Sequence, residues 1–522
     1  MSRIARSCAA AFSLLVFAAS LAVAPRAAAQ ALARPVVAPD SAAALRFASR
    51  AESILLATPV NKGEWGLLVV DAATGQPLYA LNPDSFFVPA SNMKLLTTAL
   101  ALDTLGADFR FRTTVEATGP LSSSGTLSGD LVLVGRGDPN LSNRKFPFDS
   151  KEEFDGPPAK VLDDLAAKVA ARGVHKITGD IVADDSYFPR ERYPDGWEID
   201  DMVWEYGAAV SALVVNDNTV KVTLTPGASP GSPVHSSIEP SQNEFSLSNL
   251  VATSPAKEKS DLTLTRDPGA PLVTISGTLA AHSSPRELVL AIQEPAAFSA
   301  FLFSQSLAAR GISWDGKLRV QHDPDPAEAS RTVLAEHLSL PLGTSVRLVN
   351  KISQNLHTEV LLRASARSQG RWSSPDDLPE FPVAFYQKAG IPAGDVIQSD
   401  GSGLSRHDMV TPRALVALLE FAQHQPWFTP FFDSLPIAGV DGTLGERFKD
   451  SPIVGRIHAK TGSVTHVRSL SGYADTPSGR RLIFSLLSNN QGGRKRETSD
   501  AIEALCLAMI EEFDAPPSGA GK

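Results

Sequence analysis

A serine followed three residues later by a lysine heads a long apolar run in this chain. Ser91 and Lys94 precede leucines and alanines that recur at helical spacing from Leu95 to Leu105, and Gly106 ends the pattern. The spacing predicts a helix that begins near Ser91. Residues three apart on a helix lie on the same side, with their Cβ atoms about 5–6 Å apart. A hydroxyl nucleophile and an amine base would therefore share one rigid element.

The Ser-x-x-Lys pattern is weak by itself, because it occurs elsewhere in the chain. Ser142 to Lys145 runs into Phe146-Pro147, and a proline at that point cannot continue a helix. Ser254 to Lys257 leads into alternating leucines that are typical of a strand. Ser91 differs from both in having the apolar helical run after it. The ordinary alternative for Ser91 and Lys94 is a capping serine and a solvated lysine.

The N-terminus has the pattern of a secretory signal. Arg3 and Arg6 precede an apolar run from Ala9 to Ala24, and Ala27-Ala28-Ala29 offers a small-residue cleavage site. The run is shorter than a membrane-spanning helix requires. We interpret residues 1–29 as a cleaved signal peptide, with an uncleaved anchor as the alternative. We therefore expect a periplasmic protein without a transmembrane anchor.

Composition narrows the class of protein further. Of the two cysteines, the mature chain would keep Cys506, so it can form no internal disulfide, which suits a bacterial envelope better than a eukaryotic secretory route. The formal net charge of −9 argues against a nucleic-acid partner, because phosphate binding needs a basic face. The ten histidines show no paired ligand spacing, and one cysteine cannot build a zinc site. We expect no metal and no cofactor.

The mature chain is too long for a single core. Its pattern of elements predicts a mixed α/β (α+β) catalytic domain that is interrupted by two smaller domains. Val161 to Ala183 and Phe298 to Val320 each contain a helix, an Ala-Ala-Arg-Gly turn and a strand, and we interpret them as one unit that occurs twice. The expected divisions are 1–29, signal peptide; 30–105 and 334–515, catalytic domain; 106–190 and 276–333, inserted α/β domain; 191–275, nested β-rich domain; and 516–522, disordered tail.

Two further motifs add polar groups to the first. Ser353-Gln354-Asn355 lies at the junction of two helical patterns and offers a hydroxyl and an amide. Lys460-Thr461-Gly462 occurs once and falls in a predicted strand at the edge of a sheet. An edge strand can pair with an extended peptide through main-chain hydrogen bonds, and Gly462 leaves that approach open. Each motif alone also has an ordinary explanation, a capped helix or an exposed strand end.

Ser-x-x-Lys on a helix, then Ser-x-Asn, then Lys-Thr-Gly on a strand is the signature of penicillin-binding proteins and serine β-lactamases. The chain resembles one family in particular, the class C low-molecular-mass penicillin-binding proteins, or D-alanyl-D-alanine carboxypeptidase/endopeptidases. The resemblance implies a penicilloyl-serine transferase domain (β-lactamase/transpeptidase-like) with two smaller domains inserted between the first and second motifs, the innermost mostly β. Over nearly all of the mature chain, it includes Gly137-Asp138-Pro139, Tyr206-Gly207-Ala208, Val210 to Leu213, Asn216-Asp217-Asn218, Asn350 to Asn355, Asp400 to Arg406, Gly439 to Leu444 and Ala459 to Gly462.

The resemblance implies hydrolysis of D-alanyl-D-alanine ends, or of D-alanyl cross-links, in peptidoglycan peptides. Ser91 would attack the carbonyl carbon, Lys94 would act as its base, and β-lactams would acylate Ser91. Ser353 would pass a proton to the leaving amine. The other expected site residues are Asn355, which would hold a substrate amide; Lys460, a cation that together with burial would lower the pKa of Lys94; Thr461, which with Lys460 would bind the carboxylate; Gly462; and Ser463, whose backbone N–H would join that of Ser91 in an oxyanion hole.

Two other functions stay open at this point. A serine β-lactamase shares the first and third motifs, but it deacylates with an extra glutamate or a tyrosine, and Ser353 stands where that tyrosine would be. A catalytically silent peptidoglycan-binding scaffold would use the inserted domains as its working part. The sequence leaves open the balance of carboxypeptidase and endopeptidase activity, the contacts of the inserted domains, the residue that recognises the third stem-peptide amino acid, and the oligomeric state, a homodimer included.

Overall fold

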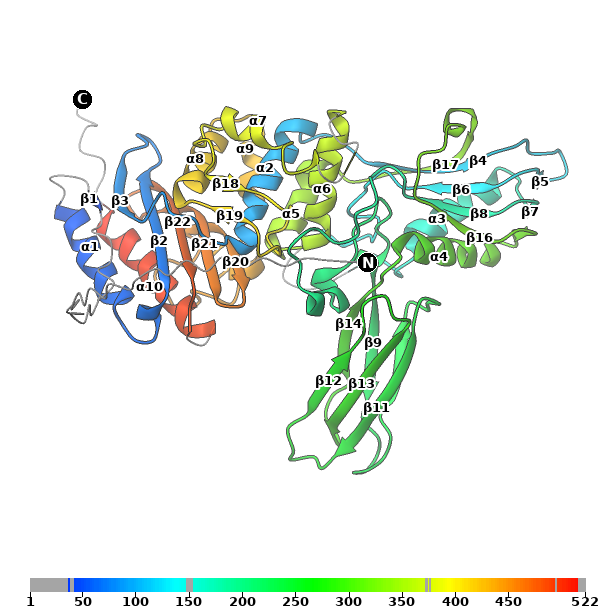
Figure 1. The fold of residues 1–522 in the computed structure, drawn as a ribbon, viewed down its shortest axis with the longest axis horizontal. Helices are drawn as coiled ribbons and strands as arrows, with labels where there is room; N and C mark the ends of the chain where they lie inside the picture. The colour runs from blue at the N-terminus through cyan, green and yellow to red at the C-terminus, as the bar shows by residue number, and fades with distance from the viewer. Residues whose placement is uncertain are drawn as a thin grey trace, which may run out of the picture. The chain divides into compact units, whose positions relative to one another are not determined.

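The computed structural model describes residues 36–37, 42–146, 154–370, 374, 377–492 and 495–514 (Figure 1). The predicted signal peptide (1–29) and the predicted tail (516–522) lie outside these residues. Within the part of the chain that is described, no helix is both long enough and apolar enough to cross a membrane.

A six-stranded sheet carries the third motif and pairs strands from the early and late parts of the chain. Its order is β1-β3-β2-β22-β21-β20, and β2 pairs antiparallel with β22 from Glu64↔Asn489 to Asp71↔Leu482. β20, β21 and β22 form an antiparallel meander, and β20 lies at the edge of the sheet, as predicted for the strand of Lys460-Thr461-Gly462. The strands are β1 (Val36–Val37), β2 (Glu64–Asp71), β3 (Pro77–Leu81), β20 (Ile457–Val464), β21 (Val467–Asp475) and β22 (Arg481–Asn489).

Helices cover both faces of this sheet. On one face, α1 (Ala42–Leu55) and α10 (Lys495–Glu512) lie side by side (Figure 1). Because successive side chains of a strand point to opposite faces, Leu67 and Val69 of β2 pack toward these two helices. Leu68 and Val70 pack instead toward the helices of the other face. Burying each such side chain contributes about 1.5–3 kcal/mol.

The second helical layer contains the first and second motifs. α2 (Met93–Leu105) is buried on every side from Met93 to Leu102. Around it pack α5 (Leu342–Lys351), α6 (Asn355–Ser368), α7 (Val383–Lys388), α8 (Pro412–Ala422) and α9 (Phe428–Ser434). Thr411 caps α8 as its sequence predicts, since its hydroxyl accepts the Ala414 N–H at 3.0 Å. The sequence pattern also predicts a helix over 377–389, but α7 is shorter than this, because Pro379 and Pro382 break the first half.

The inserted domain contains a five-stranded sheet in the order β16-β8-β6-β4-β17. The predicted repeat is confirmed: α3 (Lys160–Ala171) leads to β8 (Ile181–Asp184), α4 (Pro295–Ala309) leads to β16 (Leu318–Gln321), and the two strands pair in parallel. The remaining strands of the sheet are β4 (Arg112–Ala117), β6 (Leu131–Val134) and β17 (Thr332–Leu338). A small parallel sheet beside it contains β5 (Thr126–Leu127), β7 (Lys176–Ile177) and β15 (Ser313–Trp314).

Two expected domain boundaries fall inside strands. β17 continues to Leu338 and pairs with β4, past the boundary at 333. β13 (Leu272–Ala280) crosses the boundary at 275, and β14 (Arg286–Ala291) pairs with β9 (Thr219–Thr225). Composition changes before these strands end, whereas pairing with distant strands determines where they end. We therefore propose 219–291 for the nested β-rich domain, which also holds β10 (His235–Glu239), β11 (Ser246–Ser254) and β12 (Asp261–Thr265).

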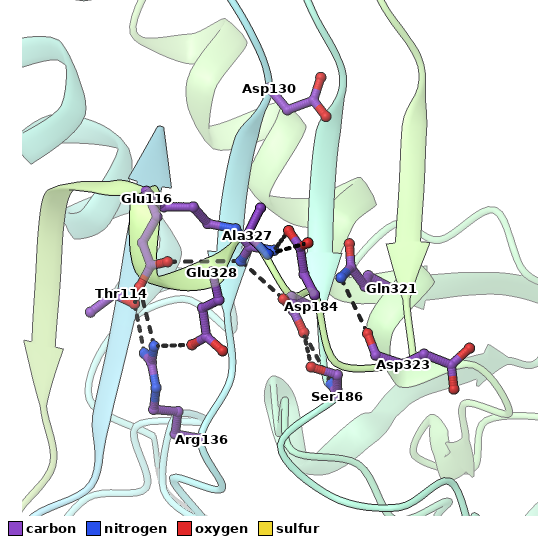
Figure 2. Close-up of polar contacts among 12 residues, drawn as sticks. Thr114, Glu116, Asp130, Arg136, Asp184, Ser186, Gln321, Asp323, Ala327 and Glu328 are labelled. Carbon is purple, nitrogen blue, oxygen red and sulfur yellow. Dashed lines mark hydrogen bonds and ion pairs between the residues drawn. The ribbon is translucent and has the colours of Figure 1, made fainter. Parts of the chain in front are cut away.

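A network of ion pairs covers the face of the inserted sheet that does not pack against α3 and α4. Glu116 and Asp184 project from β4 and β8 toward a loop that carries Glu328 (Figure 2). Arg136 lies 3.2 Å from Glu116 and 2.9 Å from Glu328, and Arg331, buried in the same cluster, lies 3.0 Å from Asp184. These pairs hold the loop over the sheet and keep the buried carboxylates compensated.

Candidate active site

Ser91 lies in a 3-10 turn, Ala90–Asn92, just before the first residue of α2. The Asn92 side chain ties this turn to the sheet, because its Nδ2 donates to the main-chain carbonyl of Lys460 at 2.9 Å. Ala90 has a φ of 47°, a left-handed conformation that is costly for a residue with a Cβ. Such strain persists where neighbouring contacts impose it, and here it lays the turn against β20.

Lys94 is fully buried one turn along α2. Its Nζ lies 3.0 Å from Ser91 Oγ, and it donates to Asn355 Oδ1 (2.6 Å) and to the Ser402 carbonyl (2.7 Å). Burial lowers the pKa of Lys94 to about 7, and the carboxylates of Asp400 and Glu359 oppose that shift. The nucleophile and the base predicted from Ser-x-x-Lys are therefore in contact.

Lys460 joins the second motif to the third. It is fully buried on β20, and its Nζ donates to Ser353 Oγ at 2.8 Å and to the Thr461 carbonyl at 2.9 Å. Burial, and then the charge of Lys94, hold the pKa of Lys460 well below its usual range. We expected burial and the Lys460 cation together to lower the pKa of Lys94; burial is the cause of the shift, and Lys460 is not among the groups that contribute to it.

The second motif lies between α5 and α6, as predicted. Ser353 has a left-handed φ of 63° in the connection, and Gln354 caps α6 by accepting the His357 N–H. Asn355 is the first residue of α6. Its Oδ1 accepts from Lys94, and its Nδ2 donates to the Tyr206 carbonyl of the inserted segment at 2.8 Å. Both ends of the amide that we expected to hold a substrate therefore have protein partners in this structure.

Close packing requires the glycine of Lys-Thr-Gly. A Cβ on Gly462 would lie 2.0 Å from Ser469 Oγ and 2.6 Å from the Pro89 carbonyl oxygen. Gly462 therefore lets the turn that carries Ser91 approach β20, which is a different reason from the open substrate path that we expected. The Thr461 hydroxyl next to it lies 2.7 Å from that of Thr443, a residue to which the sequence analysis assigned no role.

The motifs open into one pocket of about 410 Å³. Three of its residues, Glu198, Asp201 and Arg406, place charges of both signs around the opening. The lining consists of Ser91, Ser353, Asn355, Gly403, Leu404, Arg406, Ser463, Val464 and Thr465, with Glu198, Asp201 and Tyr206 from the inserted segment. The structure thus brings the expected Ser91, Ser353, Asn355 and Ser463 together at one surface, with Lys94 and Lys460 buried directly behind them.

Several residues of the site were not predicted from the sequence. Ser402 contributes a main-chain carbonyl, which leaves no mark in a sequence. Glu359 could have been found from its spacing, since it lies four residues after Asn355 and so on the same side of α6. The chain offers no obvious metal site: among the residues described, no cluster of three or more His, Cys, Asp or Glu could hold an ion.

A pocket-lining serine in contact with a buried lysine at the start of a helix, a Ser-x-Asn junction and a Lys-Thr-Gly edge strand, arranged on this sheet, define the penicilloyl-serine transferase fold. The profile of the D-Ala-D-Ala carboxypeptidase 3 (S13) family matches residues 48–508. The chain belongs to this family, which confirms the predicted resemblance.

Individual relatives are similar to this chain over most of their length. The chain is 34% identical over 500 residues to the D-alanyl-D-alanine carboxypeptidase of Actinomadura sp. (strain R39), covering 93% of this chain and 88% of that protein. The crystal structure of penicillin-binding protein 4 (dacB) from Haemophilus influenzae superposes with a TM-score of 0.78 at 25% identity, covering 89% of this chain and 99% of that one. The same protein in complex with a novel β-lactam superposes with a TM-score of 0.71.

Proposed function

We propose that this protein is a serine D-alanyl-D-alanine carboxypeptidase/endopeptidase that hydrolyses peptidoglycan stem peptides through an acyl-enzyme on Ser91. The observation that carries the proposal is the 3.0 Å contact between Ser91 Oγ and the buried Nζ of Lys94, at the wall of a pocket that also exposes Ser353 and Ser463. The family to which the chain belongs supports the same activity.

Lys94 supplies the base for acylation. With its pKa lowered to about 7, a large share of Lys94 is neutral near neutral pH and can take the Ser91 proton. The Ser91 oxygen then forms a bond to the carbonyl carbon of the penultimate D-alanine. The resulting oxyanion would accept hydrogen bonds from the backbone N–H groups of Ser91 and Ser463, each worth about 3–4 kcal/mol in comparable sites.

Lys460 would assist departure of the leaving group through Ser353. Ser353, which Lys460 contacts at 2.8 Å, would pass a proton to the amine of the departing D-alanine as the peptide bond breaks. Thr461 and Lys460 would bind the terminal carboxylate, and Thr443 places a second hydroxyl beside Thr461. Asn355 would hold a substrate amide by exchanging its bond to the Tyr206 carbonyl. Water then hydrolyses the ester on Ser91.

The charged rim of the pocket suits a substrate that carries both an amine and a carboxylate beyond the scissile bond. Glu198 and Asp201 would face the amine, and Arg406 would face the carboxylate. A stem peptide with a diamino acid has this character. We also propose export to the bacterial periplasm, on the basis of the signal pattern in residues 1–29 and the bacterial relatives.

One experiment tests the function against its rivals. Mass spectrometry of the purified protein after penicillin treatment is expected to show one covalent adduct on Ser91, and Ser91→Ala is expected to show none. Digestion of cross-linked muropeptides should then release D-alanine or separate the cross-linked peptides. Rapid turnover of a chromogenic cephalosporin would instead indicate a β-lactamase, and the absence of any adduct or digestion would indicate a scaffold protein.

A further inference from the structure

The hydrogen bonds of Lys94 select one orientation of its amine. Asn355 Oδ1 and the Ser402 carbonyl, at 2.6 and 2.7 Å, can only accept hydrogen bonds. A neutral amine has two N–H groups and one lone pair. Both N–H groups are therefore occupied, and the lone pair is left to face the Ser91 hydroxyl at 3.0 Å. The Ser402 carbonyl is thus one of the two acceptors that orient the Lys94 amine, and Asn355 Oδ1 is the other.

Three buried carboxyl groups hold the loop that carries this carbonyl. Asp408 accepts the N–H groups of residues 399 and 400, Glu359 accepts those of 401 and 402, and Asp400 accepts those of 403, 404 and 405. All three carboxyl groups are fully buried. Every backbone N–H from Ser399 to Ser405 is therefore bound, so the direction of the Ser402 carbonyl is set by side chains.

Asp400 has the largest share in this arrangement. In addition to three backbone N–H groups, it accepts Ser402 Oγ–H (2.9 Å) and the indole N–H of Trp197 from the inserted segment (2.9 Å). Burial opposes its ionisation, but a hydrogen bond from the Asp408 side chain, followed by those from Ser405, Trp197 and Gly403, holds the pKa of Asp400 below its usual range. Asp408, buried beside it, has a strongly raised pKa because of burial and the charge of Asp400. Asp400 is therefore the carboxylate of the pair, and Asp408 keeps its proton.

We propose that Asp400 is a positioning residue for acylation: its carboxylate holds the 399–405 loop so that the Ser402 carbonyl binds Lys94 and turns the amine's lone pair toward Ser91. The inference rests on the proposed function, in which Lys94 is the base. Asp400 itself is buried and does not line the pocket. Asp400 would affect the reaction in two ways: its hydrogen bonds hold the 399–405 loop, and its charge affects the pKa of Lys94.

The charge of Asp400 gives the inference a distinctive readout. The charged or titratable groups that face Lys94 are Asp400 and Asp408 from the loop region, Glu359 from α6, and Lys460 from β20. Glu359 is itself paired with Arg363 at 2.7 Å. A carboxylate near Lys94 stabilises its ammonium form and raises its pKa. The acylation rate should fall at low pH as Lys94 becomes protonated, and we call this fall the acid limb. Removing the Asp400 charge should lower the pKa of Lys94 and therefore move the acid limb to lower pH.

Three substitutions separate charge from position. Asp400→Asn removes the charge at constant shape, and Asp408→Asn replaces a neutral acid with a neutral amide as its matched control. Gly401→Ala moves the loop without altering charge, because the added Cβ would lie 3.1 Å from the Thr358 carbonyl oxygen and 3.3 Å from Leu362 Cβ. The measurement is the second-order rate of acylation by benzylpenicillin as a function of pH, together with the thermal unfolding temperature of each variant.

The expected results differ for each variant. Asp400→Asn should be acylated at least about tenfold more slowly, since small misplacements of a catalytic group cost up to about 100-fold, and its acid limb should move to lower pH. Gly401→Ala should be slower at every pH with the limb unmoved. Asp408→Asn should keep the wild-type limb.

A folded Asp400→Asn variant with the wild-type rate and limb would overturn the inference while leaving the proposed function intact. If Asp400→Asn does not fold, Gly401→Ala decides: a wild-type rate overturns the inference, and a lower rate at every pH supports it. Wild-type protein that forms no Ser91 adduct would overturn the function and the inference together.

Discussion

Asn92 donates its side-chain N–H to the main-chain carbonyl of Lys460 at 2.9 Å. The residue between the nucleophile and its base thus holds the strand that carries the second lysine. The first and third motifs, which are far apart in the chain, are fixed to each other by a buried bond that belongs to neither set of reacting groups. This bond allows the geometry of the site to be tested without removing a catalytic side chain.

Asn92→Ala should loosen this connection. The substitution leaves the buried Lys460 carbonyl without its donor, which costs about 1–3 kcal/mol, and it lets the turn that carries Ser91 move relative to β20. We expect a lower unfolding temperature and slower acylation by a β-lactam, with the adduct still on Ser91. An unchanged acylation rate, measured by quenched mass spectrometry, would show that this bond is not needed for alignment.

The pH dependence of acylation should report Lys94. Because burial lowers its pKa to about 7, Lys94 is protonated below that pH and cannot accept the Ser91 proton. The acylation rate should therefore rise with pH and level off above about 7. Lys94→Met should abolish this rise along with nearly all acylation. A rate that is flat through neutral pH would argue that another group is the base.

Gly462→Ala should separate the Ser91 turn from β20. The added Cβ would meet Ser469 Oγ at 2.0 Å and the Pro89 carbonyl oxygen at 2.6 Å, and the turn must move to make room. We expect acylation to fall by about 100-fold, the typical cost of such a misplacement. Gly492→Ala is the matched control, because no atom of the described residues lies within 4 Å of a Cβ at that position. Equal rates for the two variants would contradict the prediction.

Asp217→Asn should destabilise the junction of the inserted domain with α6. Asp217 is buried between Arg144, whose Nε lies 2.7 Å away, and His357 at 2.9 Å. Burial opposes ionisation of Asp217, but these two neighbours hold its pKa below the usual range. Loss of the charge leaves Arg144 buried without this carboxylate, a change that typically costs about 3–5 kcal/mol.

The lowered pKa of Asp217 also predicts how the stability of the protein changes in acid. A carboxylate with a depressed pKa stabilises the fold above its unfolded pKa and loses that contribution as the pH falls through the folded value. Wild-type protein should therefore lose stability in acid more steeply than Asp217→Asn. Chemical unfolding of both proteins at neutral and at acidic pH measures the difference, and parallel losses would remove Asp217 as a source of acid sensitivity.

The sequence predicts most of the site because side-chain chemistry and periodicity carry it. Ser91 and Lys94 share a helical face, Ser353 lies at a break between helical patterns, and Lys460 lies in an apolar run flanked by turns. The Ser402 carbonyl could not be predicted, because every residue has one and only the fold directs it. The spacing of Glu359 from Asn355 places it on the same side of α6, but its burial could not be predicted, since that depends on packing against a loop more than forty residues away.

The sequence predicts most of the fold, as it does most of the site. The meander of β20 to β22 and the repeated helix–strand unit follow from local patterns. The ends of the inserted domains do not, because β17 and β14 pair with strands from much earlier in the chain. Local composition carries no information about such a partner. Strand ends that are decided by long-range pairing were therefore the least predictable part.

The pairing of β2 with β22 has a consequence for the time at which the site can form. The central sheet cannot close until the segment that ends at Asn489 is available to pair with the strand that begins at Glu64, and both inserted domains precede that segment in the chain. A chain that lacks β22 would therefore carry Ser91 on an incomplete sheet. Such late closure would keep the hydrolase inert until nearly the whole chain is present.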